Sequence, residues 1–149
     1  MMIRYKKIGH DIYPLLELLQ KSLSLDEEVV FAYVFGSYGL ERPGPLSDVD
    51  IALYLISAER IWKKKMKLIG DITSILKTNE VDLVILNETP LSLCYQVLRT
   101  GNLLFSKDEA LRIGFISTVY DMYCDTEPLR QFAQENLLAR IQDGRIGLR

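Results

Sequence analysis

The sequence predicts an α/β (α+β) domain, in which helices flank a small mixed β-sheet and further helices follow at the C-terminal end. Three short runs are apolar on both faces, as expected for strands inside a covered sheet: residues 29–35, 51–56 and 81–86. Between these runs, apolar residues recur at helical spacing. A chain of 149 residues fits one domain. We expect a core at residues 1–106 and a C-terminal helical extension of the same domain at 107–149.

Four strands are expected, and the first three are bounded by polar or glycine-containing segments. They cover residues 29–35, 48–56, 80–86 and 103–105. The last strand is short, which is typical of a sheet edge. The loop at residues 36–47 is rich in glycine and proline, and we expect it to open with a short helical turn.

Five helices are expected from apolar periodicity and from residues that favour helix ends. They cover residues 10–23, 57–78, 90–100, 106 or 108 to 125, and 127–142. Pro14 lies in the opening turn of the first helix, where its missing N–H costs little, and Pro128 opens the last one in the same way. Ser57 can cap the second helix, and Gly101 is expected to close the third.

Composition excludes several classes of protein. The net charge of −2 provides no overall basic field, so direct nucleic-acid binding is not expected. No apolar run reaches the roughly 18 residues of a membrane span, and no signal-type stretch follows the first residues. Cys94 and Cys124 lack metal-ligand spacing, so both are expected to be reduced, buried and apolar in character. The expected compartment is the cytoplasm.

The most informative motif is Gly36-Ser37, followed after a ten-residue loop by Asp48-Val49-Asp50. Two acids at positions i and i+2 of a strand point to the same face. Neighbouring carboxylates repel each other unless a positive charge lies between them, and a divalent cation such as Mg²⁺ prefers such oxygen ligands. The pattern therefore predicts a metal site that holds a nucleotide.

A two-metal site for phosphoryl or nucleotidyl transfer needs a third acid and backbone donors for phosphates. Asp82 is the candidate for the third acid because it interrupts an apolar strand, and Glu80, expected to be solvated at the strand entry, is the nearby alternative. Gly36 allows close approach of a phosphate, and Ser37 adds a hydroxyl and further N–H groups. Tyr38 lies beside this turn and could either contact nucleotide or pack the turn.

These residues resemble the signature of the DNA polymerase β-like nucleotidyltransferase superfamily. The ten-residue spacer and the short chain are similar to its MNT group, the minimal nucleotidyltransferases. The likeness continues through residues 81–87, 98–105 and 120–138. It makes residues 1–106 the nucleotidyltransferase core.

Members of the MNT group often act as antitoxins to HEPN-domain ribonuclease toxins, transferring AMP from ATP to a toxin tyrosine with Mg²⁺. The resemblance therefore implies a HEPN-domain toxin and ATP as partners, and a site with two Mg²⁺ ions. It implies that Asp48 and Asp50 bind the metals, and that Asp82 helps to bind the second one and polarises the acceptor hydroxyl. Gly36 and Ser37 would hold the triphosphate.

The phosphate loop departs from the pattern of many relatives, which carry a cation where this chain has Leu40, followed here by Glu41. Arg42 is the candidate that substitutes for that cation, and with Tyr38 it completes the expected nucleotide-binding set.

Three alternatives remain open at this stage. The acceptor could be a small hydroxyl compound, as in aminoglycoside nucleotidyltransferases, or the domain could neutralise a toxin by binding alone. The assembly could be a homodimer or a hetero-oligomer.

The basic cluster at residues 63–65 is expected to be a solvated helix face, although it could meet a triphosphate, RNA or an acidic partner. Trp62 is expected to pack against the sheet, with a role as partner anchor as the alternative.

Overall fold

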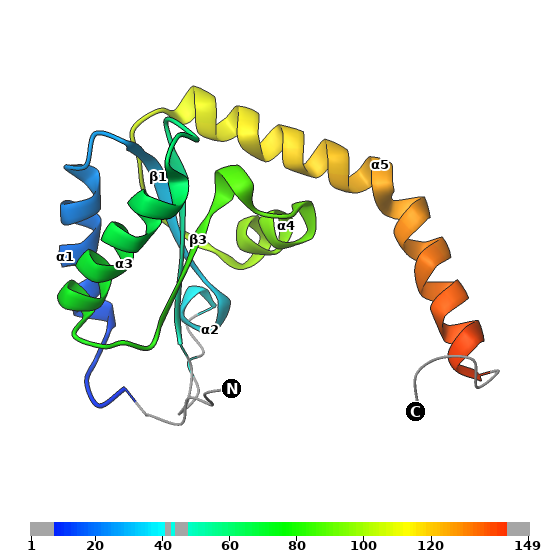
Figure 1. Ribbon diagram of the computed structural model, residues 1–149, viewed down its shortest axis with the longest axis horizontal. Helices are drawn as coiled ribbons and strands as arrows, with labels where there is room; N and C mark the ends of the chain where they lie inside the picture. Colours follow the sequence, from blue (N-terminus) through cyan, green and yellow to red (C-terminus); the bar gives the residue numbers. More distant parts are fainter. Residues whose placement is uncertain (1–7, 41–42, 44–47, 143–149) are drawn as a thin grey trace.

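A four-stranded mixed sheet forms the centre of the molecule, as the computed structural model shows for residues 8–40, 43 and 48–142 (Figure 1). The strands β1 (Val29–Phe35), β2 (Val49–Leu55), β3 (Val81–Ile85) and β4 (Asn102–Ser106) have the order β3-β2-β1-β4. The pairs β1–β2 and β1–β4 are antiparallel, whereas β2 and β3 are parallel. The predicted mixed sheet is confirmed, with β4 at its edge.

Helices cover both faces of the sheet. On one side lie α1 (Tyr13–Ser24) and α3 (Ile61–Leu76), and on the other lie α4 (Leu91–Thr100) and the first part of α5 (Glu109–Gln142) (Figure 1). The burial of apolar side chains on both faces is the main favourable contribution to folding. All seven residues of β1 are buried, which explains why that run is apolar without interruption. None of the helices in these described parts of the chain is long and apolar enough to cross a membrane.

Two helices begin later than their apolar periodicity predicted, because polar side chains form turns before them. The Tyr13 N–H donates to the Asp11 carboxylate at 3.1 Å, so α1 begins at Tyr13, with Pro14 in its opening turn as expected. The Glu59 N–H donates to the Ser57 hydroxyl at 3.1 Å, and Arg60 is left-handed at φ 54°. Ser57 therefore closes a turn and does not cap α3.

The last two expected helices are one continuous helix, α5, with Pro128 in its interior. Proline removes one backbone donor from a helix and normally bends it, and Figure 1 shows α5 turning downward in its distal part. Two side chains make local contacts in this part of the helix: the Thr126 hydroxyl donates to the carbonyls of Met122 and Tyr123 at 3.1 Å. The Arg130 guanidinium lies 3.4 Å from the Tyr123 ring centre. The carbonyl that loses its helical donor is that of Cys124, four residues before the proline, and these contacts do not involve it.

Two side chains expected in the interior lie at the surface. Trp62 is 75% exposed near the start of α3, so the expected packing against the sheet is wrong. The first turn of α3 turns this position away from the core-facing residues Ile61 and Leu68. Cys94 is buried as predicted, whereas Cys124 is exposed because it lies on the part of α5 that leaves the domain.

Asn87 ties the end of β2 to the short 3₁₀-helix η1 (Leu86–Glu88). Its carboxamide accepts from the Leu55 N–H and donates to the Leu55 carbonyl, both at 2.8 Å.

Asn87→Ala should lower the free energy of unfolding by about 1–3 kcal/mol, since both backbone groups lose their partner. Urea unfolding measures the change, and the exposed Asn79→Ala is the control, expected within about 0.5 kcal/mol of the parent. Equal stability of the two variants would contradict this role.

Candidate nucleotidyltransferase site

The predicted site residues gather at one end of the sheet. β1 is antiparallel to β2, and β2 is parallel to β3, so the end of β1 meets the starts of the other two strands. The short helix α2 (Gly36–Gly39) follows β1 at this end (Figure 1). It is the helical turn expected at the start of the loop, and the loop residues 41–42 and 44–47, Arg42 included, lie outside the described part of the chain.

The three acids lie on neighbouring strands. Asp50 is paired directly with Asp82 in the β2–β3 ladder, and Asp48 stands immediately before β2. Adjacent strands are about 4.8 Å apart, so the carboxylates of Asp50 and Asp82 are close neighbours on one face of the sheet. Ala52 and Tyr54 follow Asp50 on this face and pack on the α4 and α5 side. The acids therefore face the same side of the sheet as α5.

The electrostatics of Asp50 reflect this crowding. Burial of the carboxyl, followed by the charges of Asp82 and Asp48, raises the pKa of Asp50 to about 6. Desolvation and like charges both disfavour the ionised form. Asp82, by contrast, is exposed. The arrangement gives one half-buried acid and one accessible acid side by side, and it concentrates negative charge at the end of the sheet.

Gly36 and Asp50 are in close contact, which explains the glycine in the motif. Gly36 has φ +64°, a conformation that favours glycine, and a Cβ there would lie 2.1 Å from the Asp50 carboxylate oxygen Oδ2. The motif glycine thus makes room for the motif acid. Ser37 follows in the same turn and is partly exposed, so its hydroxyl and backbone lie at this end of the sheet.

Tyr38 occupies a different environment from the rest of the turn. Its ring is buried and packs against Tyr13, with ring centres 5.7 Å apart. It belongs to the core cluster on the α1 and α3 side. The side chain therefore packs the turn, and nucleotide contact by Tyr38 stays a prediction.

Two positioning residues were missed from the sequence. A Cβ on Gly39 would lie 2.7 Å from the Thr100 carbonyl and 2.8 Å from the Val34 carbonyl, so α2 is wedged between α4 and β1. The Asn102 carboxamide donates to the Gly39 carbonyl at 2.6 Å. The Gly36-x-x-Gly39 spacing was an available signal for the first residue, whereas nothing in the sequence marks Asn102.

Glu80 is not solvated as expected, because it is only 8% exposed. Its N–H donates to the Thr78 hydroxyl at 3.1 Å, and its carbonyl accepts from the Val49 N–H at 2.9 Å. The backbone is thereby held at the entry of the β2–β3 ladder, and the side chain is covered there. The accessible carboxylate at the start of β3 is that of Asp82.

The donor chemistry at this end fits a hard divalent cation. No three His, Cys, Asp or Glu side chains among residues 8–40, 43 and 48–142 are arranged as a metal-binding group. The fit rests on charge and atom type: Asp48, Asp50 and Asp82 supply carboxylate oxygens, and burial together with the charges of Asp82 and Asp48 raises the pKa of Asp50. Mg²⁺ binds through one or two carboxylates plus substrate phosphates, and it does not need an all-protein cage.

A glycine turn after one strand, with acids on the next two strands at the same sheet end, defines the nucleotidyltransferase class of site. The family model "Polymerase beta, Nucleotidyltransferase" matches residues 17–110, which include the turn and all three acids. The chain belongs to the polymerase beta nucleotidyltransferase family. A search of curated proteins gave no match.

Solved structures of toxin–antitoxin pairs have the same fold. A chain of a toxin–antitoxin structure with AMP-PNP is 24% identical, with a TM-score of 0.68, covering 83% of this chain and 98% of that one. A chain from tri-AMPylated Shewanella oneidensis HEPN toxin in complex with MNT antitoxin is 25% identical, with a TM-score of 0.65 and coverages of 84% and 98%. A chain of the toxin–antitoxin MntA–HepT is 24% identical, with a TM-score of 0.65 and the same coverages.

Proposed function

We propose that this chain transfers AMP from ATP to a protein hydroxyl, a tyrosine of a cognate HEPN toxin, and thereby acts as an antitoxin. The observation that carries the proposal is the contact between the glycine turn and the acids, in which Gly36 abuts Asp50 and Asp50 pairs with Asp82. The similar solved structures include a HEPN toxin that is tri-AMPylated and a toxin–antitoxin pair with AMP-PNP. They support AMP as the transferred group and a toxin as its acceptor.

The reaction is an in-line displacement at the α-phosphorus of ATP. The acceptor oxygen forms a bond to that phosphorus while the bond to the β-bridging oxygen breaks, and pyrophosphate leaves. Asp82, the accessible acid, accepts the hydrogen bond of the acceptor hydroxyl and takes its proton. Gly36 and Ser37 present backbone N–H groups to the phosphates, and Asp48 and Asp50 would hold Mg²⁺ with Asp82. Bound Mg²⁺ neutralises the phosphate charge and polarises the reacting oxygens.

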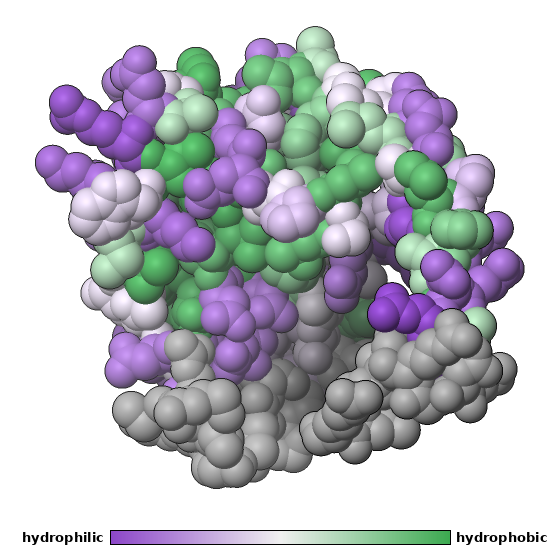
Figure 2. Space-filling model, turned by 45° about the vertical axis from the view of Figure 1, so that its right-hand side comes forward, coloured by the Kyte–Doolittle hydropathy of each residue, from purple (hydrophilic) through white to green (hydrophobic). Residues whose placement is uncertain are grey.

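The distal part of α5 supports a protein as the acceptor. Every side chain from residue 131 to 141 is exposed, although this stretch contains several large apolar residues: Phe132, Leu137, Leu138 and Ile141. Figure 2, with the α5 side turned forward, shows hydrophobic residues gathered among hydrophilic ones on this face. The same side of the sheet carries the acids, and α5 turns toward the end of the molecule where α2 lies (Figure 1). A partner bound to α5 is thus on the catalytic side.

Phe132→Glu should weaken partner binding at least about 10-fold, because it replaces the exposed aromatic side chain of this stretch by a charge. Phe132 is 66% exposed, so the free energy of unfolding of the variant should lie within about 0.5 kcal/mol of that of the parent. Gln131→Glu, one residue earlier on the same helix, is the control and should bind normally. Calorimetric titration with the partner measures the affinity. Equal affinity of the two variants would remove α5 from the interface.

The proposed reaction is tested by incubating the chain with α-³²P-ATP, Mg²⁺ and the protein encoded by the neighbouring gene. We expect the label to appear on that protein, at a tyrosine identified by mass spectrometry, and its toxicity to disappear. Label carried by a small hydroxyl compound, with none on the protein, would contradict the protein acceptor. Neutralisation without any label would show that binding alone suffices.

A further inference from the structure

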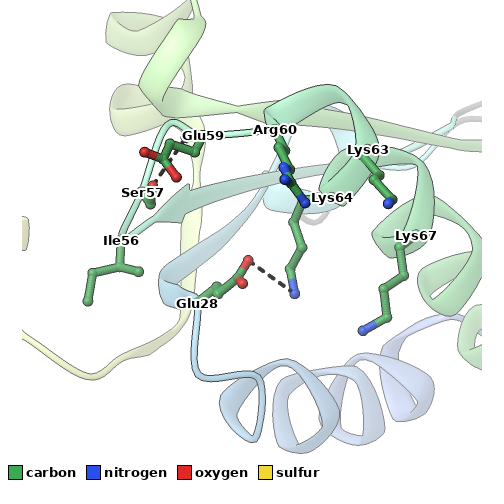
Figure 3. Close-up of a pocket in the computed structure, with 8 residues that line it drawn as sticks. All are labelled: Glu28, Ile56, Ser57, Glu59, Arg60, Lys63, Lys64 and Lys67. Atoms are coloured by element: carbon green, nitrogen blue, oxygen red, sulfur yellow. Dashed lines mark hydrogen bonds and ion pairs between the residues drawn. The ribbon is translucent and has the colours of Figure 1, made fainter.

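A second charged feature lies at the opposite end of the sheet from the acids. It is a hollow of about 750 Å³, which we call the basic hollow, lined by eight residues: Glu28, Ile56, Ser57, Glu59, Arg60, Lys63, Lys64 and Lys67 (Figure 3). Glu28 precedes β1 and Ile56 follows β2, whereas Asp50 lies near the start of β2. The seven residues of β2 separate the two ends by roughly 20 Å. The basic hollow is thus not part of the acidic site.

The cations of the basic hollow come from the start of α3 and the residue before it. Lys63, Lys64 and Lys67 have the spacing i, i+1 and i+4 on one side of the helix, and Arg60 directly precedes the helix and lines the same hollow. In Figure 3 they extend into the hollow from one side, while Ile56 and Ser57 lie on the other side. The first two turns of α3 and the residue before them therefore present four positive charges to one open space.

One of the four cations is neutralised within the protein. The Lys64 ammonium lies 2.8 Å from the Asp26 carboxylate and 3.4 Å from that of Glu28. Arg60, Lys63 and Lys67 form no ion pair with any residue in the described part of the chain. Lys67 also interacts electrostatically with Asp26, and Glu59 is a second acid of the lining, but the four cations outnumber the two acids that line the hollow. The excess of positive charge favours the entry of an anion.

The start of α3 adds to the positive potential. This helix begins without a side-chain cap and without an acid in its first turn. The N–H groups of that turn point toward the N-terminal end of α3 and carry partial positive charge there. A carboxylate in the first turn would be the ordinary stabilising choice, and this chain has Trp62 and lysines there instead. The first turn of α3 therefore lacks a negative charge of its own, and an external anion would supply the stabilisation that an acidic side chain usually provides there.

We propose that the basic hollow is a second anion site that binds a small ligand carrying two or more linked phosphates, such as a nucleoside diphosphate or triphosphate. Its volume lies in the range of small-molecule sites. Arginine binds phosphate through a planar fork and lysine through a mobile point charge, so Arg60 with Lys63 and Lys67 matches linked phosphates. Ile56 is 68% exposed and offers an apolar surface for a base. The site is independent of the transfer reaction proposed above.

The experiment titrates the full chain with ATP and with tripolyphosphate in EDTA by isothermal titration calorimetry. Trp62 is the only tryptophan of the chain and directly precedes Lys63 in sequence, so its fluorescence gives a second signal next to the hollow. Without a divalent cation the acids at the other end repel phosphates, so binding there is suppressed. We expect saturable binding. Tighter binding of ATP identifies a nucleotide site, and equal binding identifies a polyphosphate site.

The matched variants separate the site from overall charge. Lys63→Gln/Lys67→Gln should weaken binding at least 10-fold, whereas Lys21→Gln/Lys65→Gln, with the same loss of charge outside the hollow, should change it less than 2-fold. The absence of a saturable signal, or equal weakening by both pairs, would overturn the proposal. A short single-stranded RNA that binds more tightly than ATP, with the same lysine dependence, would also overturn it in favour of a nucleic-acid surface.

Discussion

Asp50→Asn is expected to abolish AMP transfer, lowering the rate by about 1,000-fold or more. The substitution keeps the size of the side chain but removes a charge from the acid that abuts the Gly36 turn and pairs with Asp82. In the proposed reaction this negative charge would hold Mg²⁺, and the ion would in turn neutralise the phosphates of ATP. The measurement is the initial rate of label transfer to the partner at saturating ATP and Mg²⁺. A rate within 10-fold of the parent would exclude Asp50 from the chemistry.

The same substitution should stabilise the protein when no metal is present. The folded-state pKa of Asp50 is raised from 3.8 to about 6 by burial and by the charges of Asp82 and Asp48. A raised carboxyl pKa means that the folded state binds the proton more tightly, so stability falls as pH rises from about 4 to 6. Two pKa units correspond to about 3 kcal/mol, and solvent screening reduces this to about 1–2 kcal/mol.

Urea unfolding in EDTA at pH 7.5 and at pH 4.5 tests this expectation. Asp50→Asn should exceed the parent in free energy of unfolding at pH 7.5, and the difference should shrink toward pH 4.5. Asp71→Asn, an exposed acid of α3, is the control and should show no such trend. A variant that loses both activity and stability would indicate that Asp50 holds the fold together, which contradicts an acid kept for function.

The strands could be predicted closely because each one is a short run bounded by polar or glycine residues. β1 illustrates this: residues 29–35 were expected, and Val29–Phe35 is observed, fully buried. Its apolar pattern reports burial on both faces, which in turn requires helices on both sides. The sheet order followed less directly: the inner position of β1 was anticipated from its uninterrupted apolar run, and the position of β4 at an edge from its short length.

The helix boundaries were harder to predict because they depend on single hydrogen bonds and on tertiary context. The hydroxyl of Ser57 closes a turn at residues 57–59, which delays α3 to Ile61. Proline opens helices more often than it lies inside them, yet α5 continues through Pro128. Neither outcome can be predicted from apolar periodicity, because the spacing of apolar residues indicates which side of a helix is buried and not the residues at which the helix begins and ends.

The acids of the candidate site were named from the sequence, whereas the packing around them was not. Asp50 was named with Asp48 as a pair at positions i and i+2 of a strand, and Asp82 because it interrupts an apolar strand. The parallel β2–β3 ladder brings Asp50 and Asp82 side by side, and their catalytic role stays a prediction. The inward position of Glu80 and the bond from Asn102 to Gly39 depend on neighbours that are distant in sequence. The charges at a site are visible in the sequence because they are costly to bury, whereas the residues that hold a turn in place resemble any other polar residue.

Gly36→Ala should separate activity from stability at this site. The left-handed backbone at φ +64° costs a residue with a Cβ about 1–2 kcal/mol, and the variant should unfold more easily by that amount. The new methyl group would lie 2.1 Å from the Asp50 carboxylate oxygen Oδ2, so the carboxylate must move. That atom is the free end of a side chain, so its displacement adds little strain to the fold. The displaced acid should lower the transfer rate by about 100-fold, since small misplacements of catalytic groups cost this much.

Gly70→Ala is the matched control, because Gly70 lies in α3 and nothing stands within 4 Å of a Cβ there. It should keep full activity and gain about 0.5–1 kcal/mol, since alanine suits a helix interior better than glycine. Label transfer gives kcat and KM for ATP, and urea unfolding gives stability. A Gly36→Ala protein with normal kcat would mean that the turn does not position Asp50. A fall in kcat with KM for ATP little changed would place the role of Gly36 in aligning the acid, because a lost phosphate contact would raise KM first.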